Sequence, residues 1–346
     1  MNNKSLVITS ISTELNQTFY NLILKSVKNN ITPIIITDEV NQNFSAIGTN
    51  TINIKGQLEM PLEILEYLPL NSYSRKNIGY LVAFASQSKW IIETDDDNIP
   101  FDNFFTLDSE DIIKVRVPET NQTWINYYKL FGNNTAWPRG FPLSLIKSNQ
   151  KVDFIYENIK LESIGIMQVC ANKDPDVDAI FRLTQNLPQT FIDMDPVLIK
   201  SGQIAPFNSQ CTWWAAKFIE LMYFPSYISW RAADIWRSII ATQILHAHGY
   251  NILFWGPKVE QIRNNHNLMK DFEQEVDCYL KTEPLFKILT DTPELIQGKS
   301  LGEDLLRCYE KLFEEGFFPS EEIILLKKWL SDIYNIRSKN LIEFKL

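Results

Sequence analysis

The sequence has few of the residues that build zinc sites and disulfide frameworks. Only three His occur in 346 residues, and the four Cys are scattered, without a CxxC pair. Structural zinc sites and disulfide frameworks need such residues at short, regular spacings. We therefore expect a chain from a reducing compartment, with neither a structural zinc nor a His-rich metal centre.

Long apolar runs are also missing. No window of the sequence provides the roughly 18 uncharged apolar residues that a membrane-spanning helix needs. The first residues, MNNKSLVITSIST, have too short an apolar part for a secretory signal. We expect no transmembrane segment, and a soluble, cytoplasmic protein.

Basic residues are outnumbered by acidic ones. The chain has 33 Lys and Arg against 42 Asp and Glu, and its net charge is −9. This balance disfavours non-specific binding to nucleic acid, so we expect no nucleic-acid partner. With 45% hydrophobic and 12% aromatic residues, the chain has enough apolar surface for a packed interior. Its length suits one large domain and a smaller one.

The most informative stretch is 89–100, KWIIETDDDNIP. Its apolar run predicts a buried strand that ends at three consecutive carboxylates, Asp95, Asp96 and Asp97. Three ionised carboxylates at one strand end repel one another, so a divalent cation would stabilise them. Mg²⁺ and Mn²⁺ take such oxygen ligands and keep positions open for phosphates. This DXD motif predicts a metal and nucleotide-sugar site; a solvated acidic turn is the alternative.

The first forty residues read as strand, helix and strand. Apolar runs at 6–10 and 33–37 flank the segment 13–28, in which apolar residues recur at helical spacing. Short connections favour a parallel sheet, and ligands of such sheets bind at the carboxyl ends of the strands. Thr9 and Asp38 lie at those ends and are candidate nucleoside contacts, although ordinary loop residues would fit both positions.

The segment 73–87 predicts a helix with basic residues at its start. Ile78 and Leu81 belong to its apolar face, and Arg75, Lys76 and Asn77 occupy its first turn. Cationic side chains at a helix start oppose the helix dipole, so a nearby anion would explain them. A diphosphate or a uracil-type base is the candidate ligand, and a solvated basic turn is the alternative.

A second basic candidate lies in the segment 137–143, WPRGFPL. Two Pro and one Gly around Arg139 exclude a helix or a central strand there. We predict a rigid loop that presents Arg139, whose forked donors suit phosphate or carboxylate. A surface turn packed by Trp137 and Phe141 is the alternative.

Two later stretches contain candidate sugar or acceptor contacts. Asp176 and Asp178 form a second acidic cluster, which suits a helix cap or sugar hydroxyl groups. The segment 206–214, PFNSQCTWW, combines amides with indoles, a common composition at carbohydrate sites. Asn208 and Trp213 are therefore candidates, although the Trp side chain suits the core equally well.

An amphipathic helix is predicted at 229–245. Asp234 lies near its start and Arg237 follows three residues later. The two side chains either face one cleft or pair with each other. From residue 259 onward the pattern is helical without a clear strand. We therefore predict a nucleotide-sugar-binding and catalytic α/β domain at 1–257 and a helical C-terminal region at 258–346, a candidate for packing, homo-oligomer formation or acceptor docking.

Several segments together resemble the STELLO-type glycosyltransferases. These segments lie between residues 73 and 334 and occur in the same order as in that family. They are YSRKNIGYLVAF, ETDDDN, WPRGFPL, PDVDAIFRLT, PFNSQ, RAADIWRS, EEGFF and LKKWLSDI. The triple Asp and the PRG-x-P loop are more distantly similar to the reversibly glycosylated polypeptides, or UDP-arabinopyranose mutases.

The resemblance implies a GT-A-like α/β fold, that is, a Rossmann-like mixed, mainly parallel sheet flanked by helices, with a helical C-terminal extension. It also implies a nucleotide-sugar donor and Mn²⁺ or Mg²⁺, with Asp95 and Asp97 as metal ligands and Asp96 adjacent. Arg139 matches the loop in which the mutase relatives become glycosylated. The sequence departs from these relatives in having no counterpart of the plant members' Golgi anchor. It also has Asn98 where the mutases have a Cys, which argues against mutase chemistry.

These features predict a metal-dependent glycosyltransferase that moves a sugar from a UDP- or GDP-sugar to a carbohydrate or glycoconjugate acceptor, as in polysaccharide biosynthesis. Inverting transfer needs a base, for which Asp234 is the candidate, with Asp176 or Asp178 in reserve. A retaining route needs none. A non-catalytic GT-A scaffold and a metal-dependent sugar nucleotidyltransferase are the alternatives. The donor, the acceptor and the oligomeric state stay open.

Overall fold

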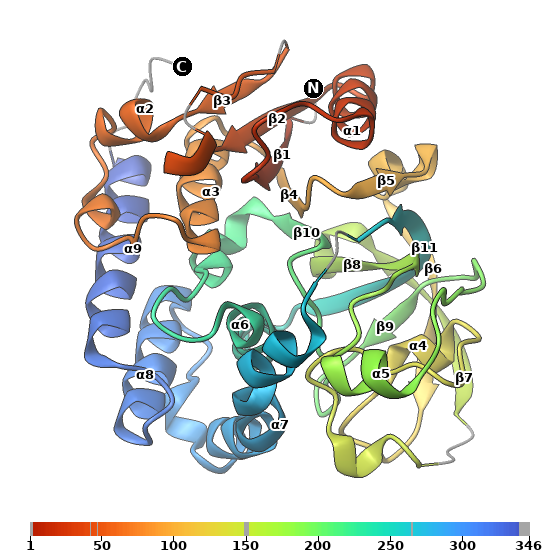
Figure 1. The fold of residues 1–346 in the computed structure, drawn as a ribbon. Coiled ribbons are helices and arrows are strands. Elements are labelled where there is room, and N and C mark those ends of the chain that lie inside the picture. Colours follow the sequence, from red (N-terminus) through yellow and green to blue (C-terminus); the bar gives the residue numbers. More distant parts are fainter. Residues whose placement is uncertain (1–2, 42, 47, 149–151, 264–265, 339–346) are drawn as a thin grey trace.

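A single mixed sheet runs through the molecule and is flanked by helices (Figure 1). The computed structural model describes residues 3–338, apart from 42, 47, 149–151 and 264–265. Within these residues the sheet has 11 strands in the order β3-β2-β1-β4-β10-β8-β11-β9-β6-β7, and β5 pairs with β11 off this path.

The N-terminal part of the sheet is parallel, as the strand–helix–strand pattern predicts. Its four strands are β1 (Lys4–Thr9), β2 (Ile31–Ile36), β3 (Asn50–Ile52) and β4 (Trp90–Thr94). The helices between them are α1 (Gln17–Lys28), α2 (Ile54–Leu58) and α3 (Lys76–Ala85). Strand β4 ends directly before the triple Asp, so the carboxylates lie at the carboxyl edge of this parallel part.

The rest of the sheet is mixed. Strand β10 runs antiparallel to β4 and β8, and β11 runs parallel to β8 and antiparallel to β9 and β5. At the sheet edge, β7 pairs antiparallel with β6. These strands are β5 (Asn98–Pro100), β6 (Ile112–Glu119), β7 (Asp153–Lys160), β8 (Ile164–Lys173), β9 (Val197–Ile199), β10 (Cys211–Ala215) and β11 (Asn251–Gln261). The expected α/β class with a C-terminal helical part is confirmed, and the architecture fits a GT-A-like fold.

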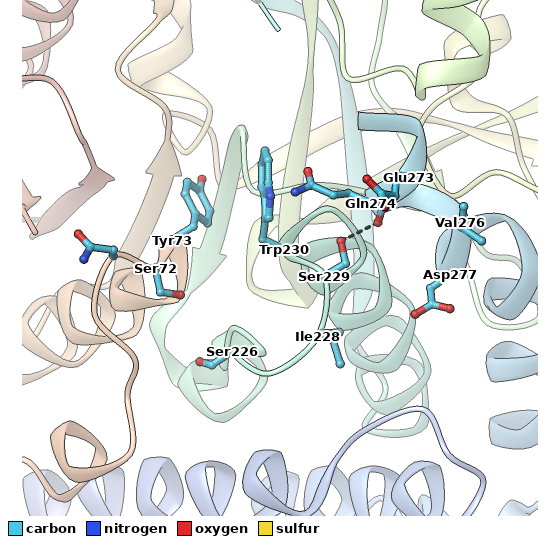
Figure 2. A pocket seen from close by; sticks show the side chains of 11 residues that line it. Ser72, Tyr73, Ser226, Ile228, Ser229, Trp230, Glu273, Gln274, Val276 and Asp277 are labelled. Carbon is cyan, nitrogen blue, oxygen red and sulfur yellow. Dashed lines mark hydrogen bonds between the residues drawn. The ribbon is translucent and has the colours of Figure 1, made fainter. Parts of the chain in front are cut away.

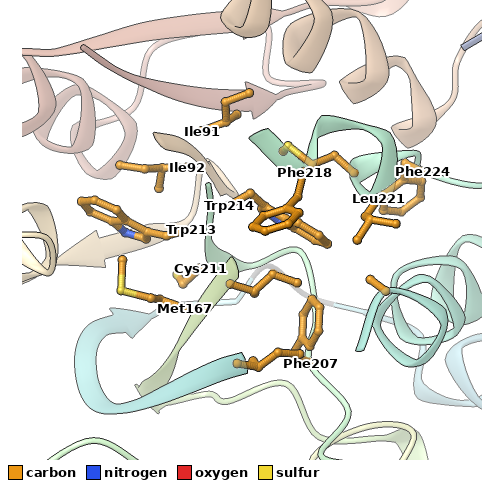
Figure 3. Packing of buried hydrophobic residues seen from close by; sticks show 14 of the residues in the cluster. Ile91, Ile92, Met167, Phe207, Cys211, Trp213, Trp214, Phe218, Leu221 and Phe224 are labelled. Atoms are coloured by element: carbon orange, nitrogen blue, oxygen red, sulfur yellow. The ribbon is translucent and has the colours of Figure 1, made fainter. Parts of the chain in front are cut away.

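Both faces of the central sheet are covered. Trp213 and Trp214 are consecutive in β10, so their indoles point to opposite faces, and both are fully buried (Figure 3). Trp213 lies between its cross-strand neighbours Ile92 and Met167. The Trp214 indole instead donates to Glu93 at 2.8 Å, on the side where α6 packs. A sheet buried on both sides gives the residues at its strand ends a rigid frame.

Four long helices follow or flank the second half of the sheet. They are α6 (Trp230–Ala247), α7 (Leu268–Asp291), α8 (Leu301–Glu314) and α9 (Ser320–Ser338). Shorter helices are α4 (Tyr127–Leu130) and α5 (Ala179–Thr184) and the 3₁₀ helices η1 (Glu39–Asn41), η2 (Glu63–Glu66), η3 (Tyr73–Arg75), η4 (Asp102–Thr106), η5 (Leu143–Leu145), η6 (Leu161–Ser163), η7 (Ala216–Met222) and η8 (Pro293–Leu295). No helix among the described residues is both long and apolar enough to cross a bilayer.

Buried carboxylates fasten the C-terminal helices to the rest of the molecule. Asp332 of α9 accepts hydrogen bonds from the backbone of Glu63 at 2.8 Å and Ile64 at 2.9 Å. Glu322, also in α9, accepts from the backbone of Tyr227 at 2.7 Å. The predicted domain boundary at residue 257 falls inside β11, which continues to Gln261. The division into two domains stays a prediction.

Candidate functional site

A cavity of about 520 Å³ opens at the carboxyl edge of the parallel strands. Thr9 ends β1, Asp38 follows β2, and the triple Asp follows β4, so three neighbouring strands deliver polar groups to one place. This is the edge at which α/β sheets bind their ligands. Nine of the candidate residues named above line the cavity: Thr9, Asp38, Asp95, Asp96, Asp97, Arg139, Asp176, Asn208 and Asp234.

Each carboxylate of the triple Asp has its own hydrogen-bond donors. Asp95 accepts from the Tyr73 hydroxyl at 2.5 Å and lies 3.5 Å from the Lys76 ammonium. Asp96 accepts from the Ser10 and Ser12 hydroxyl groups. Asp97 accepts from the Gln261 side-chain amide at 3.1 and 3.2 Å. The three side chains are therefore held in the cavity wall and do not form a solvated turn.

Burial changes the acidity of two of these groups. It raises the pKa of Asp95, and it raises the pKa of Asp97 to about 7, to which repulsion from Asp95 adds. A cation beside them would reverse this effect, because it stabilises the ionised forms. The donor set therefore fits a hard divalent ion in chemical type.

The protein ligands for such an ion are few. No group of three His, Cys, Asp or Glu side chains in the described part of the chain is arranged to hold a metal. An ion bound to Asp95 and Asp97 would thus take its remaining ligands from water or from a phosphate, as Mg²⁺ commonly does. The metal assignment stays a prediction.

Arg139 lies in the cavity wall between two carboxylates. Its Nε and Nη2 donate to Asp176 at 3.0 and 2.9 Å, and its Nη1 and Nη2 donate to Asp234, both at 2.8 Å. Burial by itself would raise the pKa of Asp176, but the Arg139 guanidinium outweighs it and the pKa is lowered. The forked donors that suit a phosphate are here bonded to protein carboxylates.

The carboxylate of Asp234 is likewise fully hydrogen-bonded within the protein. Both of its oxygens accept from Arg139, and one also lies 3.4 Å from the backbone nitrogen of Ser209. A base must have a free lone pair within reach of the acceptor hydroxyl. Asp234 lines the cavity as expected, but its oxygens have to exchange Arg139 for a substrate before it can take a proton.

Six of the candidates lie outside the cavity wall, which corrects their expected positions. At the start of α3, Arg75 donates to Gln57 and to the carbonyls of Leu68 and Pro69, and the Asn77 side chain bonds the backbone of Phe224 in both directions. These side chains are buried and satisfied by the protein. Residue spacing alone could not show this, because it does not reveal that Gln57 of α2 and the Phe224 backbone pack against these side chains.

Lys76 approaches the triple Asp from the protein interior. Its side chain is fully buried, and its ammonium donates to the Thr94 carbonyl at 3.2 Å while facing Asp95. It therefore balances the charge of the triple Asp within the protein and is not exposed in the cavity wall.

The remaining three candidates have structural roles. Asp178 caps α5 by accepting from the Phe181 backbone at 2.7 Å, as the helix-cap interpretation expects. Trp213 lies in the core. Arg237 donates to Glu93 at 2.7 Å, so it neither pairs with Asp234 nor faces the cavity.

The sequence reading missed several residues of the cavity wall. Tyr73 and Gln261 bond the triple Asp, and Arg263 also lines the cavity. Burial, together with nearby Arg182 and Arg231, lowers the pKa of Arg263 to about 10, and its Nη2 donates to Asp271 at 3.1 Å. Strand β11 continues past register shifts to Gln261, beyond the predicted domain boundary at residue 257, and this brings Gln261 and Arg263 to the site.

Comparisons with known proteins extend this description. Residues 231–343 match the family model of the STELLO glycosyltransferases. Two Arabidopsis thaliana proteins named probable glycosyltransferase STELLO1 and STELLO2 are 25% identical over 309 residues and 24% identical over 327 residues. These matches show that the chain is similar to the STELLO glycosyltransferases. They confirm the resemblance predicted from the sequence segments.

The STELLO relatives are much longer than this chain. The two matches cover 84% and 89% of the chain but 39% and 41% of the relatives, so the chain spans about two fifths of their length. The segment that matches the STELLO model contains Asp234 and Arg263 of the cavity wall. A solved mycobacterial protein aligns with a TM-score of 0.43 and 9% identity over 84% of this chain and 74% of its own, a likeness too distant to support an argument.

Proposed function

We propose that the chain is a glycosyltransferase that moves a sugar from a UDP- or GDP-sugar, bound with Mn²⁺ or Mg²⁺, to a carbohydrate or glycoconjugate acceptor. One observation carries the proposal: the three carboxylates after β4 line a cavity together with residues from the ends of β1 and β2. The matches to relatives named as glycosyltransferases support it.

Thr9 is the best-placed contact for the nucleoside part of the donor. Its hydroxyl is buried and has no hydrogen-bond partner among the described residues, although the residue lines the cavity. A buried hydroxyl without a partner is unfavourable, and a ligand group would relieve this. Asp38 is less available, because its oxygens accept from the backbone of Glu39 at 2.8 Å and Ser72 at 3.1 Å.

The diphosphate of the donor belongs beside the triple Asp in this proposal. Asp95 and Asp97 would hold the divalent ion, which supplies charge neutralisation to the leaving diphosphate. Lys76 offsets the negative charge of Asp95 from inside the protein. Arg263 adds a guanidinium to the same cavity wall, where it would contact the diphosphate.

The stereochemical course depends on how the acceptor loses its proton. We propose inverting transfer with Asp234 as the base, which requires the pair with Arg139 to open when the acceptor binds. The anomeric configuration of the product, read by proton NMR, tests this proposal. Retention would exclude a single displacement assisted by Asp234.

A non-catalytic scaffold is the second candidate function. The observation that favours it is the closed set of bonds among Arg139, Asp176 and Asp234, which leaves the candidate base without a free oxygen. In this alternative the cavity binds a nucleotide sugar, and the protein organises other enzymes of glycan synthesis.

Donor hydrolysis separates the candidates. The protein is incubated with Mn²⁺ and a panel of UDP- and GDP-sugars, and released nucleotide is measured. We expect release by the wild type, loss of release in Asp97→Asn, and normal release in Asp102→Asn, which removes an exposed carboxylate nearby. Metal-dependent binding without release favours the scaffold. Pyrophosphate formed from a nucleoside triphosphate and a sugar phosphate favours a nucleotidyltransferase.

A further inference from the structure

A second cavity of about 490 Å³ lies beside the first. It is bounded by the loop before α3, by the segment 226–230 that leads into α6, and by one side of α7 (Figure 2). Asn71, Ser72, Tyr73 and Trp230 line both cavities. A ligand in the second cavity would therefore adjoin a ligand in the first.

Trp230 stands at the junction with an accessible indole. It is 44% exposed, whereas seven of the other Trp side chains are less than 10% exposed. An indole left in water is unfavourable, and aromatic rings of this kind bind partners that have an apolar face and a polar edge. The Arg231 guanidinium, 5.1 Å from the ring centroid, and the Tyr73 ring, tilted at 6.4 Å, fix its orientation.

Hydrogen-bonding groups lie across the cavity from the indole. Figure 2 shows the Gln274 amide extending toward Trp230, with Glu273 next to it on α7. The Ser229 hydroxyl donates to the Gln274 backbone carbonyl at 2.6 Å, which ties the helix to the cavity floor. The Ser226 hydroxyl is buried and has no partner among the described residues. The flat apolar indole thus lies opposite amide, carboxylate and hydroxyl groups. This arrangement suits a sugar, whose C–H face can stack on the indole while its hydroxyl groups form hydrogen bonds.

The charge of the cavity limits which sugar fits. Its described lining contains Glu273 and Asp277 and no Lys or Arg, and Asp277 pairs with Lys281 at 3.1 Å. A phosphorylated or uronic-acid acceptor would meet the Glu273 and Asp277 carboxylates with no Lys or Arg in the described lining, which is unfavourable. A neutral sugar avoids this repulsion.

Tyr73 connects this cavity with the candidate donor site. Its ring lines both cavities, and its hydroxyl donates to Asp95 at 2.5 Å. We infer that the second cavity binds an uncharged carbohydrate acceptor, stacked on Trp230, with its reacting end directed past Tyr73 toward the triple Asp. This inference rests on the proposed glycosyltransferase function and names the acceptor class and its site.

Fluorine NMR tests the inference directly. The protein is labelled with 5-fluorotryptophan, and the resonance missing from Trp230→Phe identifies Trp230 among the nine Trp. Hexaoses of β-1,4-linked glucose, α-1,4-linked glucose and β-1,4-linked mannose are titrated, with hexagalacturonate as the charged comparison. We expect at least one neutral hexaose to shift the Trp230 resonance and hexagalacturonate to leave it in place.

Calorimetry with variants completes the test. Trp230→Ala is expected to weaken binding of the neutral hexaose by about tenfold or more, as for an exposed aromatic anchor. Val276→Arg, on the exposed side of α7, fills the cavity and has the same effect. Tyr334→Ala on α9, which is 71% exposed and far along the chain, is the matched control and leaves binding unchanged.

Three results would overturn the inference: no shift with any neutral hexaose at about 10 mM, equal binding of hexagalacturonate, or unchanged affinity in Trp230→Ala. A separate measurement distinguishes this failure from failure of the proposed function. If Mn²⁺ with UDP or GDP raises the melting temperature of the wild type while no hexaose binds, only the acceptor inference fails. If neither binds, the proposed function fails as well.

Discussion

Gln261, at the end of β11, donates its side-chain amide to both oxygens of Asp97, at 3.1 and 3.2 Å. The two residues are far apart in the sequence, and the bond joins the last strand to the loop after β4. It is made by a neutral donor, so the bond itself does not balance the charge of Asp97. The behaviour of this carboxylate is therefore the most sensitive probe of the site.

Asp97→Asn should stabilise the metal-free protein. The substitution removes a half-buried charge and its repulsion with Asp95 while it keeps the size of the side chain. We expect the free energy of unfolding in EDTA to rise by about 1–2 kcal/mol at neutral pH. Urea unfolding measures it, with Asp102→Asn as the exposed control. A loss of stability would show that the hydrogen bonds from Gln261 to the carboxylate outweigh the cost of its charge.

The stability of the metal-free protein should fall as pH rises through the weakly acidic range. The pKa of Asp97 is about 7 in the folded protein, against 3.8 for the free side chain, so the folded state holds the proton more tightly. Its contribution is therefore favourable at low pH and is lost between about pH 4 and 7. The difference in unfolding free energy between wild type and Asp97→Asn, measured from pH 4.5 to 8, should follow this slope. A flat difference would contradict it.

Arg139 should be essential for folding stability whatever its catalytic role. Arg139→Ala leaves the buried Asp234 and the partly buried Asp176 without their cation, and breaking a buried pair in this way typically costs about 3–5 kcal/mol. The exposed pair of Lys114 and Asp195, 3.1 Å apart, is the control, and Lys114→Ala should change stability by less than about 1 kcal/mol. Similar effects of the two substitutions on the melting temperature would contradict the description of a closed buried pair.

Asp178 should act as a helix cap and not as a sugar ligand. Asp178→Ala removes the acceptor for the first turn of α5 and should cost about 1 kcal/mol, whereas Asp178→Asn keeps an acceptor and most of the stability. Neither variant should change the KM for an acceptor sugar once an active donor is known. A change of KM in Asp178→Asn at wild-type stability would restore the sugar-binding role.

Local patterns were sufficient for the parts of the fold that depend on neighbouring residues. The strand–helix–strand opening and the strand before the triple Asp follow from apolar periodicity. Because the carboxyl ends of parallel strands lie at one edge of the sheet, Thr9 and Asp38 could be expected near Asp95, and all three line the same cavity. These positions need no knowledge of the rest of the chain.

Long-range partners explain what the sequence could not provide. Arg237 is a charged residue on a predicted amphipathic helix and could therefore face a cleft. Its partner Glu93, however, lies on a strand 144 residues away. Arg139 is likewise occupied by Asp234, 95 residues away, and Arg75 by Gln57. A buried cation and a ligand-binding cation look the same in sequence, because the difference depends on whether an acceptor group elsewhere in the chain binds the cation in the folded protein.

The central claim is that the triple Asp binds a divalent ion together with a nucleotide diphosphate. Calorimetric titration of UDP and GDP into the protein, with Mn²⁺ and with EDTA, tests it most directly. The account predicts binding of at least one nucleotide in Mn²⁺, loss of that binding in EDTA and in Asp97→Asn, and its retention in Asp102→Asn. Binding of equal strength in EDTA, or in Asp97→Asn, would contradict the account.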